Sequence, residues 1–219
     1  MGAMIEFARP DGGKTKGYLA KADKAKGGIV VIQEWWGLND QIRGIADRYA
    51  RAGYNALAPD LYKGRVTAVA DEATHLMEGL NFPDATHQDL RGAVQHLKKL
   101  GGKVAVSGYC MGGALTIAAL VHVPECDLGV GLYGIPPAEF ADPAKIRKPF
   151  QGHFANQDDW ITPAAVNTLE KAMKAADQKP EIFRYDAKHA FANERSEAYD
   201  VASANKSWER TMAFLEEHL

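Results

Sequence analysis

Residues 104–119 read Val-Ala-Val-Ser-Gly-Tyr-Cys-Met-Gly-Gly-Ala-Leu-Thr-Ile-Ala-Ala. An apolar run typical of a strand ends at Gly108, and an uncharged run typical of a helix begins near Met111. Cys110 lies between them, with Gly108 two residues before it and Gly112 two residues after it. This G-x-C-x-G pattern predicts a nucleophile elbow, a turn so sharp that the central residue adopts a strained conformation and its side chain projects from the sheet.

Cys110 also has a structural interpretation, because free cysteines are among the most buried residues and usually behave as small apolar side chains. A nucleophilic cysteine needs a base and an acid, and candidates for both follow it in the chain. The other cysteine is Cys126, and in a reducing compartment both are expected to be thiols. A redox sensor would need a resolving cysteine nearby, and we expect Cys126 to lie beyond the helix that starts at Met111.

The chain has 219 residues, 46% of them hydrophobic, with 26 Lys and Arg against 28 Asp and Glu. This length predicts one α/β domain over residues 1–219. The balanced charge argues against nucleic-acid or anionic-membrane partners and favours a small-molecule substrate. Residues 1–8 lack the basic start and apolar core of a signal peptide, and no run approaches the ~20 apolar residues of a membrane span. We therefore expect a cytoplasmic monomer or small homo-oligomer.

Strand-like and helix-like runs alternate along the chain. The continuous β-branched run at 28–32 is typical of a strand buried on both faces of a parallel sheet. We expect strands near residues 5–8, 17–21, 28–32, 54–58, 103–108, 127–133, 149–154 and 181–185. We expect helices near residues 40–52, 68–79, 85–100, from 111 onward, 163–176 and 199–219. The alternation predicts an α/β protein with a mostly parallel sheet, helices on both faces and an antiparallel edge formed by the first two strands.

Residues 129–134 read Gly-Val-Gly-Leu-Tyr-Gly and match the G-x-G-x-x-G dinucleotide pattern. In a dinucleotide site these glycines follow a strand and open a helix. Here they lie within the expected strand, and Ile-Pro-Pro follows them. We therefore reject a nucleotide site and expect no cofactor.

Four side chains that can act as a nucleophile, an acid or a base come soon after expected strands: Glu34, Cys110, Asp158 and His189. Functional groups gather at the carboxyl edge of a parallel sheet. The order nucleophile, acid, histidine is that of the α/β-hydrolase fold. Asp159 is the alternative acid, and Asp158 is favoured because it is the fourth residue past the expected strand end.

A metal site made of His153, Asp158 and Asp159 is conceivable, but no ligand spacing supports it. His153 lies inside an expected strand and is interpreted as a core or edge residue. We therefore expect no metal.

These segments together resemble the dienelactone hydrolase (carboxymethylenebutenolidase) family over nearly the whole chain. The similar segments are Gln33-Glu34-Trp35-Trp36-Gly37-Leu38-Asn39, Pro59-Asp60-Leu61-Tyr62, Gly108-Tyr109-Cys110-Met111-Gly112-Gly113, Gln157-Asp158 and His189-Ala190-Phe191. The resemblance implies an α/β-hydrolase fold, ester or lactone hydrolysis, a triad of Cys110, Asp158 and His189, and Glu34 as an accessory carboxylate.

The chain also departs from this family. Members with the named activity hold the substrate carboxylate with arginines, and the position four after the histidine is Asn193 here. Arg195 is displaced from that position, and Arg65 lies one place beyond the other expected position. The segment between Arg65 and Pro83 is short for a full lid. Arg65 is a candidate for binding a substrate carboxylate, and a solvated surface arginine is the alternative.

The residues predict a cysteine-dependent hydrolase that acts through an acyl-thioester, and the resemblance implies that its substrate is a lactone or small ester. His189 would activate the thiol, and the backbone N–H groups of Met111 and Trp35 would hold the oxyanion. Glu34 would hold the thiol or the histidine in a waiting state, or alternatively cap the helix that starts near Asn39. Two aromatic residues, Trp36 and Tyr133, are candidates for lining the pocket. The alternative function is a catalytically silent ligand-binding protein with the α/β-hydrolase fold.

Overall fold

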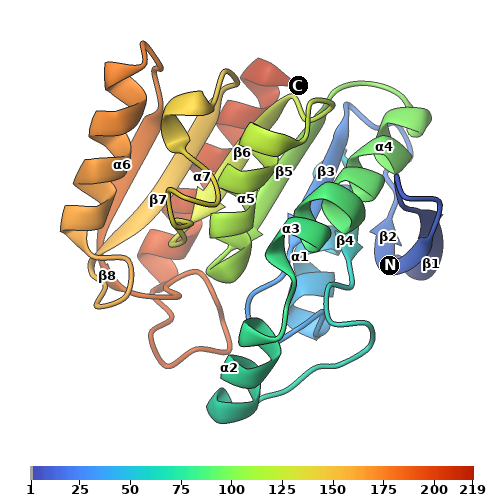
Figure 1. The fold of residues 1–219 in the computed structure, drawn as a ribbon, viewed down its shortest axis with the longest axis horizontal. Coiled ribbons are helices and arrows are strands. Elements are labelled where there is room, and N and C mark those ends of the chain that lie inside the picture. The colour runs from blue at the N-terminus through green and yellow to red at the C-terminus, as the bar shows by residue number, and fades with distance from the viewer. Residues whose placement is uncertain (1) are drawn as a thin grey trace.

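The computed structural model describes residues 2–219, whose centre is a sheet flanked by helices (Figure 1). The strands are β1 (Ala3–Ala8), β2 (Lys14–Ala20), β3 (Gly28–Ile32), β4 (Asn55–Pro59), β5 (Val104–Tyr109), β6 (Leu128–Leu132), β7 (Phe150–Gln157) and β8 (Glu181–Lys188). The helices are α1 (Asp40–Arg51), α2 (Ala70–Glu78), α3 (Phe82–Asp84), α4 (Arg91–Leu100), α5 (Met111–His122), α6 (Pro163–Ala175) and α7 (Val201–His218), with a π-helical segment at Ala85–Leu90 and a short 3₁₀ turn at Pro143–Lys145.

Within the described residues the strand order is β1-β2-β4-β3-β5-β6-β7-β8. From β4 to β8 all neighbouring strands are parallel, whereas β1 pairs with β2 and β2 pairs with β4 in antiparallel fashion. The expected α/β class, the mostly parallel sheet and its antiparallel edge are confirmed. Parallel strands aim their carboxyl ends at one edge, so the loops after β3, β5, β7 and β8 meet there.

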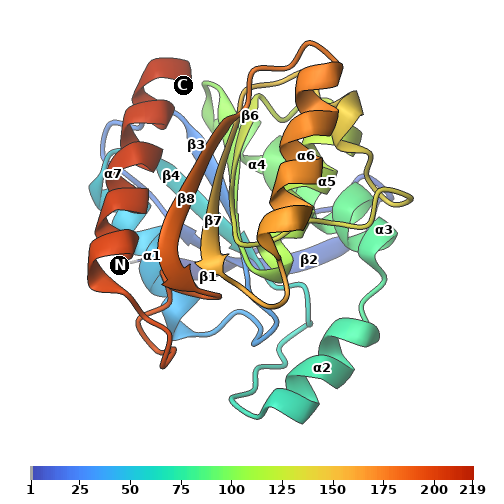
Figure 2. The same cartoon turned by 90° about the vertical axis from the view of Figure 1, so that its left-hand side faces the viewer.

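The sheet separates two hydrophobic cores because side chains alternate between its faces. Val30 and Ile32 pack with α4, α5 and α6 on one face, whereas Ile29 and Val31 pack with α1 and α7 on the other. Figure 2 shows the resulting layers, with α1 and α7 on one side and α4, α5 and α6 on the other. Both figures show α2 outside these layers, beyond the carboxyl edge of the sheet.

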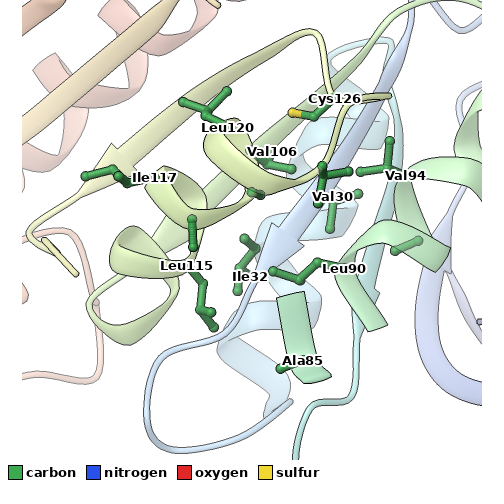
Figure 3. Close-up of a cluster of buried hydrophobic side chains, with 14 of the residues drawn as sticks. Val30, Ile32, Ala85, Leu90, Val94, Val106, Leu115, Ile117, Leu120 and Cys126 are labelled. Carbon is green, nitrogen blue, oxygen red and sulfur yellow. The ribbon is translucent and has the colours of Figure 1, made fainter. Parts of the chain in front are cut away.

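The core between α4, α5 and the sheet includes the second cysteine. Figure 3 shows Cys126 among these buried side chains, together with Val106, Leu120 and Val94. Cys126 follows the carboxyl end of α5 and Cys110 precedes its amino end. A helix of 12 residues is roughly 18 Å long, so the two thiols are too far apart to form a disulfide within the chain.

Several elements differ from the sequence-based expectation: β1 and β2 begin two and three residues earlier, and the short helix α3 was not expected. The expected helix 85–100 begins as a π-helical segment, and β7 and β8 each continue three residues further than expected. The two extensions pair with each other through Gln157 and Lys188, beyond an irregularity in register. The end of β7 is polar and exposed and gave no hydrophobic pattern. In β8 the buried Tyr185 and Ala187 alternate with the exposed Asp186 and Lys188, so that part of the strand pattern was present in the sequence.

The glycines of the dinucleotide-like pattern have a packing explanation. Gly129 and Gly131 lie within β6, as expected. A Cβ at Gly129 would lie 2.8 Å from the side chain of Leu120 on α5, so glycine lets α5 lie close to the sheet. Within residues 2–219 no helix combines the length and the apolar character needed to cross a bilayer.

Candidate active site

The turn between β5 and α5 has the geometry of a nucleophile elbow. Cys110 has φ 54° and ψ −117°, a strained conformation for a residue with a side chain. A Cβ at Gly108 would lie 1.9 Å from the carbonyl oxygen of Gly112, and a Cβ at Gly112 would lie 2.4 Å from that of Ile32. Both glycines are therefore required by close backbone approach, and the predicted elbow is confirmed.

Two residues from other loops approach the cysteine. His189 follows β8, and its Nε2 lies 3.3 Å from the Sγ of Cys110. Its Nδ1 lies 2.7 Å from the Oδ2 of Asp158, which directly follows β7. With Nδ1–H donating to Asp158, the unprotonated Nε2 faces the thiol and is placed to accept its proton.

Of the two neighbouring aspartates, only Asp158 faces the histidine. Its Oδ1 accepts hydrogen bonds from the backbone N–H groups of Trp160 and Ile161, both at 2.9 Å. Burial raises the pKa of Asp158, but the hydrogen bonds from His189 and from these backbone groups outweigh it and hold the pKa below its usual value. Asp158 therefore remains ionised beside His189, whereas Asp159 is exposed to solvent.

Glu34 lies in the loop after β3 and is 1% exposed. Its Oε2 accepts a hydrogen bond of 2.6 Å from Asn193 Nδ2, and its Oε1 accepts one of 3.2 Å from the Tyr133 hydroxyl. Burial raises the pKa of Glu34 to about 7, although both hydrogen bonds and His189 act in the opposite direction. The helix-capping alternative is wrong, because these partners hold the carboxylate and Asn39 caps α1 through the N–H of Ile42.

The thiol of Cys110 is neutral in this environment. Burial, and after it the charge of Glu34, raises the pKa of the Cys110 thiol well above its usual value. The backbone N–H groups of Met111 and Trp35 hydrogen-bond toward the sulfur and act in the opposite direction. The sequence pattern predicted these two N–H groups as oxyanion donors, and the fold brings both of them to the nucleophile.

A cavity of about 900 Å³, here called the outer cavity, opens over Cys110 and His189. Its polar and charged lining includes Glu34, Asn39, Asp40, Arg43, Asp60, Asn193, Arg195 and Glu197. Trp36 lines it as expected. Tyr133 does not line this cavity but lines a second one beside Cys110, and it directs its hydroxyl to Glu34.

The structure does not bring Arg65 into the lining of the outer cavity. The guanidinium of Arg65 is exposed and forms an ion pair with Glu72. Arg43 and Arg195 line the cavity instead and flank Asp40, at N–O distances of 3.6 and 3.9 Å. The binding of a substrate carboxylate by Arg65 stays a prediction.

The sequence did not predict that Asn193 and Trp160 contact residues of the site. Asn193 occupies the position where the resemblance implies an arginine. This departure from the family pattern was the one feature of the sequence that could have indicated its contact with Glu34. Trp160 is 60% exposed, and its ring centroid lies 5.1 Å from that of His189 and 5.2 Å from that of Trp35. Trp160 follows two aspartates in a turn, and nothing in this sequence indicated that its ring would contact His189.

His153 is a core residue, as expected. Its Nδ1 lies 2.7 Å from the Tyr185 hydroxyl and its Nε2 lies 2.9 Å from Gln151 Oε1. Burial lowers its pKa to about 3, so the ring is neutral. Among residues 2–219, no three His, Cys, Asp or Glu side chains are grouped so that they could hold a metal ion.

Comparison with known proteins places this chain in a family. A sequence model described as the Dienelactone hydrolase family matches residues 15–219. The chain is 33% identical to "Protein usf" of Aquifex pyrophilus and 30% identical to a "Putative carboxymethylenebutenolidase" of Aquifex aeolicus, with full coverage of both proteins in each case. The crystal structure of a "Putative Dienelactone Hydrolase" from Klebsiella pneumoniae superposes with a TM-score of 0.85 at 25% identity, covering 99% of both chains. This chain therefore belongs to the dienelactone hydrolase family and is a hydrolase with the α/β-hydrolase fold.

Proposed function

We propose that this protein hydrolyses a lactone or small carboxylic ester through an acyl-thioester on Cys110. The observation that carries the proposal is the continuous contact from the Cys110 sulfur through His189 to Asp158, at 3.3 and 2.7 Å. Among the hydrogen bonds of the described residues, no other histidine joins a nucleophilic side chain to a carboxylate. The family relationship supports the same reaction class.

In the proposed acylation, the Cys110 proton passes to Nε2 of His189 as the sulfur forms a bond to the substrate carbonyl carbon. The negative charge that develops on the carbonyl oxygen is held by the N–H groups of Met111 and Trp35. The tetrahedral intermediate collapses with loss of the alkoxide, which takes the proton back from His189. Asp158 keeps the ring oriented and stabilises the imidazolium.

Deacylation repeats these steps with water as the nucleophile. His189 removes a proton from the water, the new bond forms at the thioester carbonyl, and the thiolate leaves and is reprotonated by His189. For a lactone, the alcohol and the acid remain one molecule, which departs only at this stage. Water reaches His189 through the outer cavity.

We propose that Glu34 acts in the resting state of the enzyme, before the substrate binds. Its ionised carboxylate raises the pKa of Cys110 and so opposes thiolate formation while the site is empty. A carboxylate beside a developing oxyanion would oppose the reaction as well. Substrate binding must therefore displace Glu34 or favour its protonated form, which a pKa of about 7 makes accessible near neutral pH.

Glu34→Gln is expected to change the pH dependence of Cys110 reactivity, because the ionised Glu34 opposes ionisation of the thiol in the resting state. In the wild type, the rate of alkylation by iodoacetamide should have an inflection near pH 7, where Glu34 ionises. The variant should lose this inflection because glutamine does not titrate. The measurement is the alkylation rate between pH 5 and 9, with Glu209→Gln on the exposed face of α7 as the matched control. Unchanged alkylation in Glu34→Gln would refute the assignment.

The same variant is expected to be the more stable protein at alkaline pH. Because folding raises the pKa of Glu34 from 4.5 to about 7, its contribution to the free energy of unfolding is greatest below pH 4.5. That contribution is lost as the pH rises through about 7, by on the order of 3 kcal/mol. Between pH 5 and pH 8 the melting temperature of the wild type should therefore fall relative to that of Glu34→Gln. A variant that is less stable at both pH values would show that Glu34 is chiefly a structural residue.

The experiment that tests the proposed function is a hydrolysis screen followed by detection of the acyl-enzyme. The purified protein would be mixed with lactones such as dihydrocoumarin and with aryl and alkyl esters, and acid release would be followed at constant pH. Rapid acid quench and peptide mass spectrometry should find the acyl group on the peptide that contains Cys110. Binding of the same compounds without hydrolysis would instead support the silent ligand-binding alternative.

A further inference from the structure

A second cavity meets the outer cavity at the nucleophile. It has a volume of about 520 Å³ and lies on the side of α5, α2 and the loop after β6. Cys110, His189, Trp35 and Trp160 line both cavities. A carbonyl carbon attached to Cys110 therefore has space on two sides. The polarity of each cavity restricts the chemical groups that the substrate can have on that side.

The second cavity, here called the apolar cavity, has an almost entirely hydrocarbon lining. Met77, Phe82, Leu115, Ile135, Phe140 and Ile161 contribute its walls. Of the described residues, no Asp, Glu, Lys or Arg lines it, and the hydroxyl of Tyr133 is directed to Glu34. Water in such a space finds few hydrogen-bond partners, so an apolar group that enters is favoured over solvent.

The outer cavity has the opposite character. Five ionisable side chains line it besides Glu34 and the Cys110–His189 pair: Asp40, Arg43, Asp60, Arg195 and Glu197. Polar side chains such as Asn39, Thr67 and Asn193 line it as well. This side therefore suits hydroxyl, carbonyl or charged groups.

Trp35 and Trp160 separate the two spaces. Their rings meet edge to face, at an interplanar angle of 82°, and both contribute to each cavity. Trp160 is 60% exposed, so part of its surface is accessible to a ligand that lies beside the nucleophile. Its location at the boundary lets it contact an apolar substituent as that substituent passes the nucleophile.

We propose that the substrate is an ester of two unlike arms, with an alkyl or aryl arm in the apolar cavity and a polar arm in the outer cavity. This inference rests on the proposed function and adds the substrate class to it. Segment 66–83 contributes to both cavities, through residues 66–68 to the outer one and through Met77, Phe82 and Pro83 to the apolar one. The segment therefore determines specificity on both sides of the scissile bond.

The test is a chain-length series in which only the apolar arm grows. One series places that arm on the acid: glycerol monoesters of acetic, butyric, hexanoic and octanoic acids. The other places it on the alcohol: methyl, butyl, hexyl and octyl lactates. In at least one series kcat/KM should rise by up to about fourfold per added methylene, the fold-change equivalent to ~0.8 kcal/mol of transfer free energy, until the cavity is full. Butyl butyrate, apolar on both arms, should be a poorer substrate than the better butyl or butyryl ester.

A variant that fills the apolar cavity gives the second readout. Ile135→Trp should lower the ratio of kcat/KM for the hexyl arm to that for the shortest arm by at least about tenfold. Leu100→Trp is the matched control, because Leu100 is exposed at the end of α4 and lines neither cavity. The control should leave the ratio unchanged. If Ile135→Trp does not fold, the wild-type series still decides the question.

The outcomes separate this inference from the proposed function. If neither the esters of these series nor the lactones and esters of the screen are hydrolysed, both fail, whereas hydrolysis of lactones alone contradicts only the substrate class. If esters are hydrolysed but kcat/KM does not depend on chain length in either series, the substrate class is wrong and the hydrolase assignment stands. A rise with chain length that is abolished by Ile135→Trp and retained in Leu100→Trp supports the two-armed substrate.

Discussion

Cys110→Ala is expected to abolish ester hydrolysis, with a loss of turnover on the order of 10⁴-fold or more. The reason is that no other nucleophile among the described residues lies within hydrogen-bond distance of His189, whose Nε2 is 3.3 Å from the Cys110 sulfur. Alanine tolerates the strained backbone of the elbow no worse than cysteine does, so the variant should remain folded. The measurement combines single-turnover kinetics on a substrate from the screen with circular dichroism as the test of folding.

Cys126 provides the matched control for this experiment. It is 2% exposed and its thiol is directed to the carbonyl oxygen of Leu128 at 3.3 Å. Cys126→Ala should therefore leave the kinetics unchanged while costing on the order of 1 kcal/mol of stability through the cavity it creates. Iodoacetamide should label Cys110 first, faster at high pH because burial and Glu34 raise the pKa of that thiol. Inactivation that follows the labelling of Cys126 would contradict the assignment.

Asp158→Asn is expected to lower turnover by on the order of 10³- to 10⁴-fold, the second-largest effect of a single substitution. The new side chain would present an amide group to His189 where the wild type presents only acceptor oxygens, so the ring would lose the tautomer that leaves Nε2 free for the thiol proton. The change should appear in kcat more than in KM, because Asp158 stabilises the imidazolium of the transition state. Steady-state kinetics at several pH values would measure both constants.

Asp159→Asn is the neighbouring control. Asp159 is exposed, and the histidine contact belongs to Asp158 alone at 2.7 Å. Its replacement should change turnover by less than about twofold, the range expected for surface substitutions. Equal losses in the two variants, or a larger loss for Asp159→Asn, would overturn the choice of acid.

Much of the fold follows from local pattern. Continuous β-branched runs such as 28–32 and helical spacing in 85–100 suffice for the α/β class, because side-chain periodicity reports which faces are buried. The elbow pattern is also local, since Gly108, Cys110 and Gly112 lie within five residues. A Cβ at Gly108 would meet the backbone of Gly112 within the elbow, whereas the space at Gly112 is limited by Ile32 of the neighbouring strand. The order of Cys110, Asp158 and His189 then places them at one edge, because parallel strands share the direction of their carboxyl ends.

The structure alone decides the contacts between distant loops. The partners of Glu34 are Tyr133 and Asn193, which lie 99 and 159 residues away in the chain, and no periodicity relates such positions. The burial that raises the pKa of Glu34 to about 7 is likewise a property of packed neighbours.

The sequence by itself therefore determined the class of fold, the nucleophile elbow and the set of residues delivered to the carboxyl edge. Only the tertiary structure decided that Asp158 rather than Asp159 faces His189, that Arg65 turns to Glu72, and that two unlike cavities meet at Cys110. The physical reason is the range of the interactions. Hydrophobic periodicity and backbone sterics act between residues near in sequence, whereas hydrogen-bond partners, cavity shape and desolvation depend on loops that meet only after the sheet has assembled.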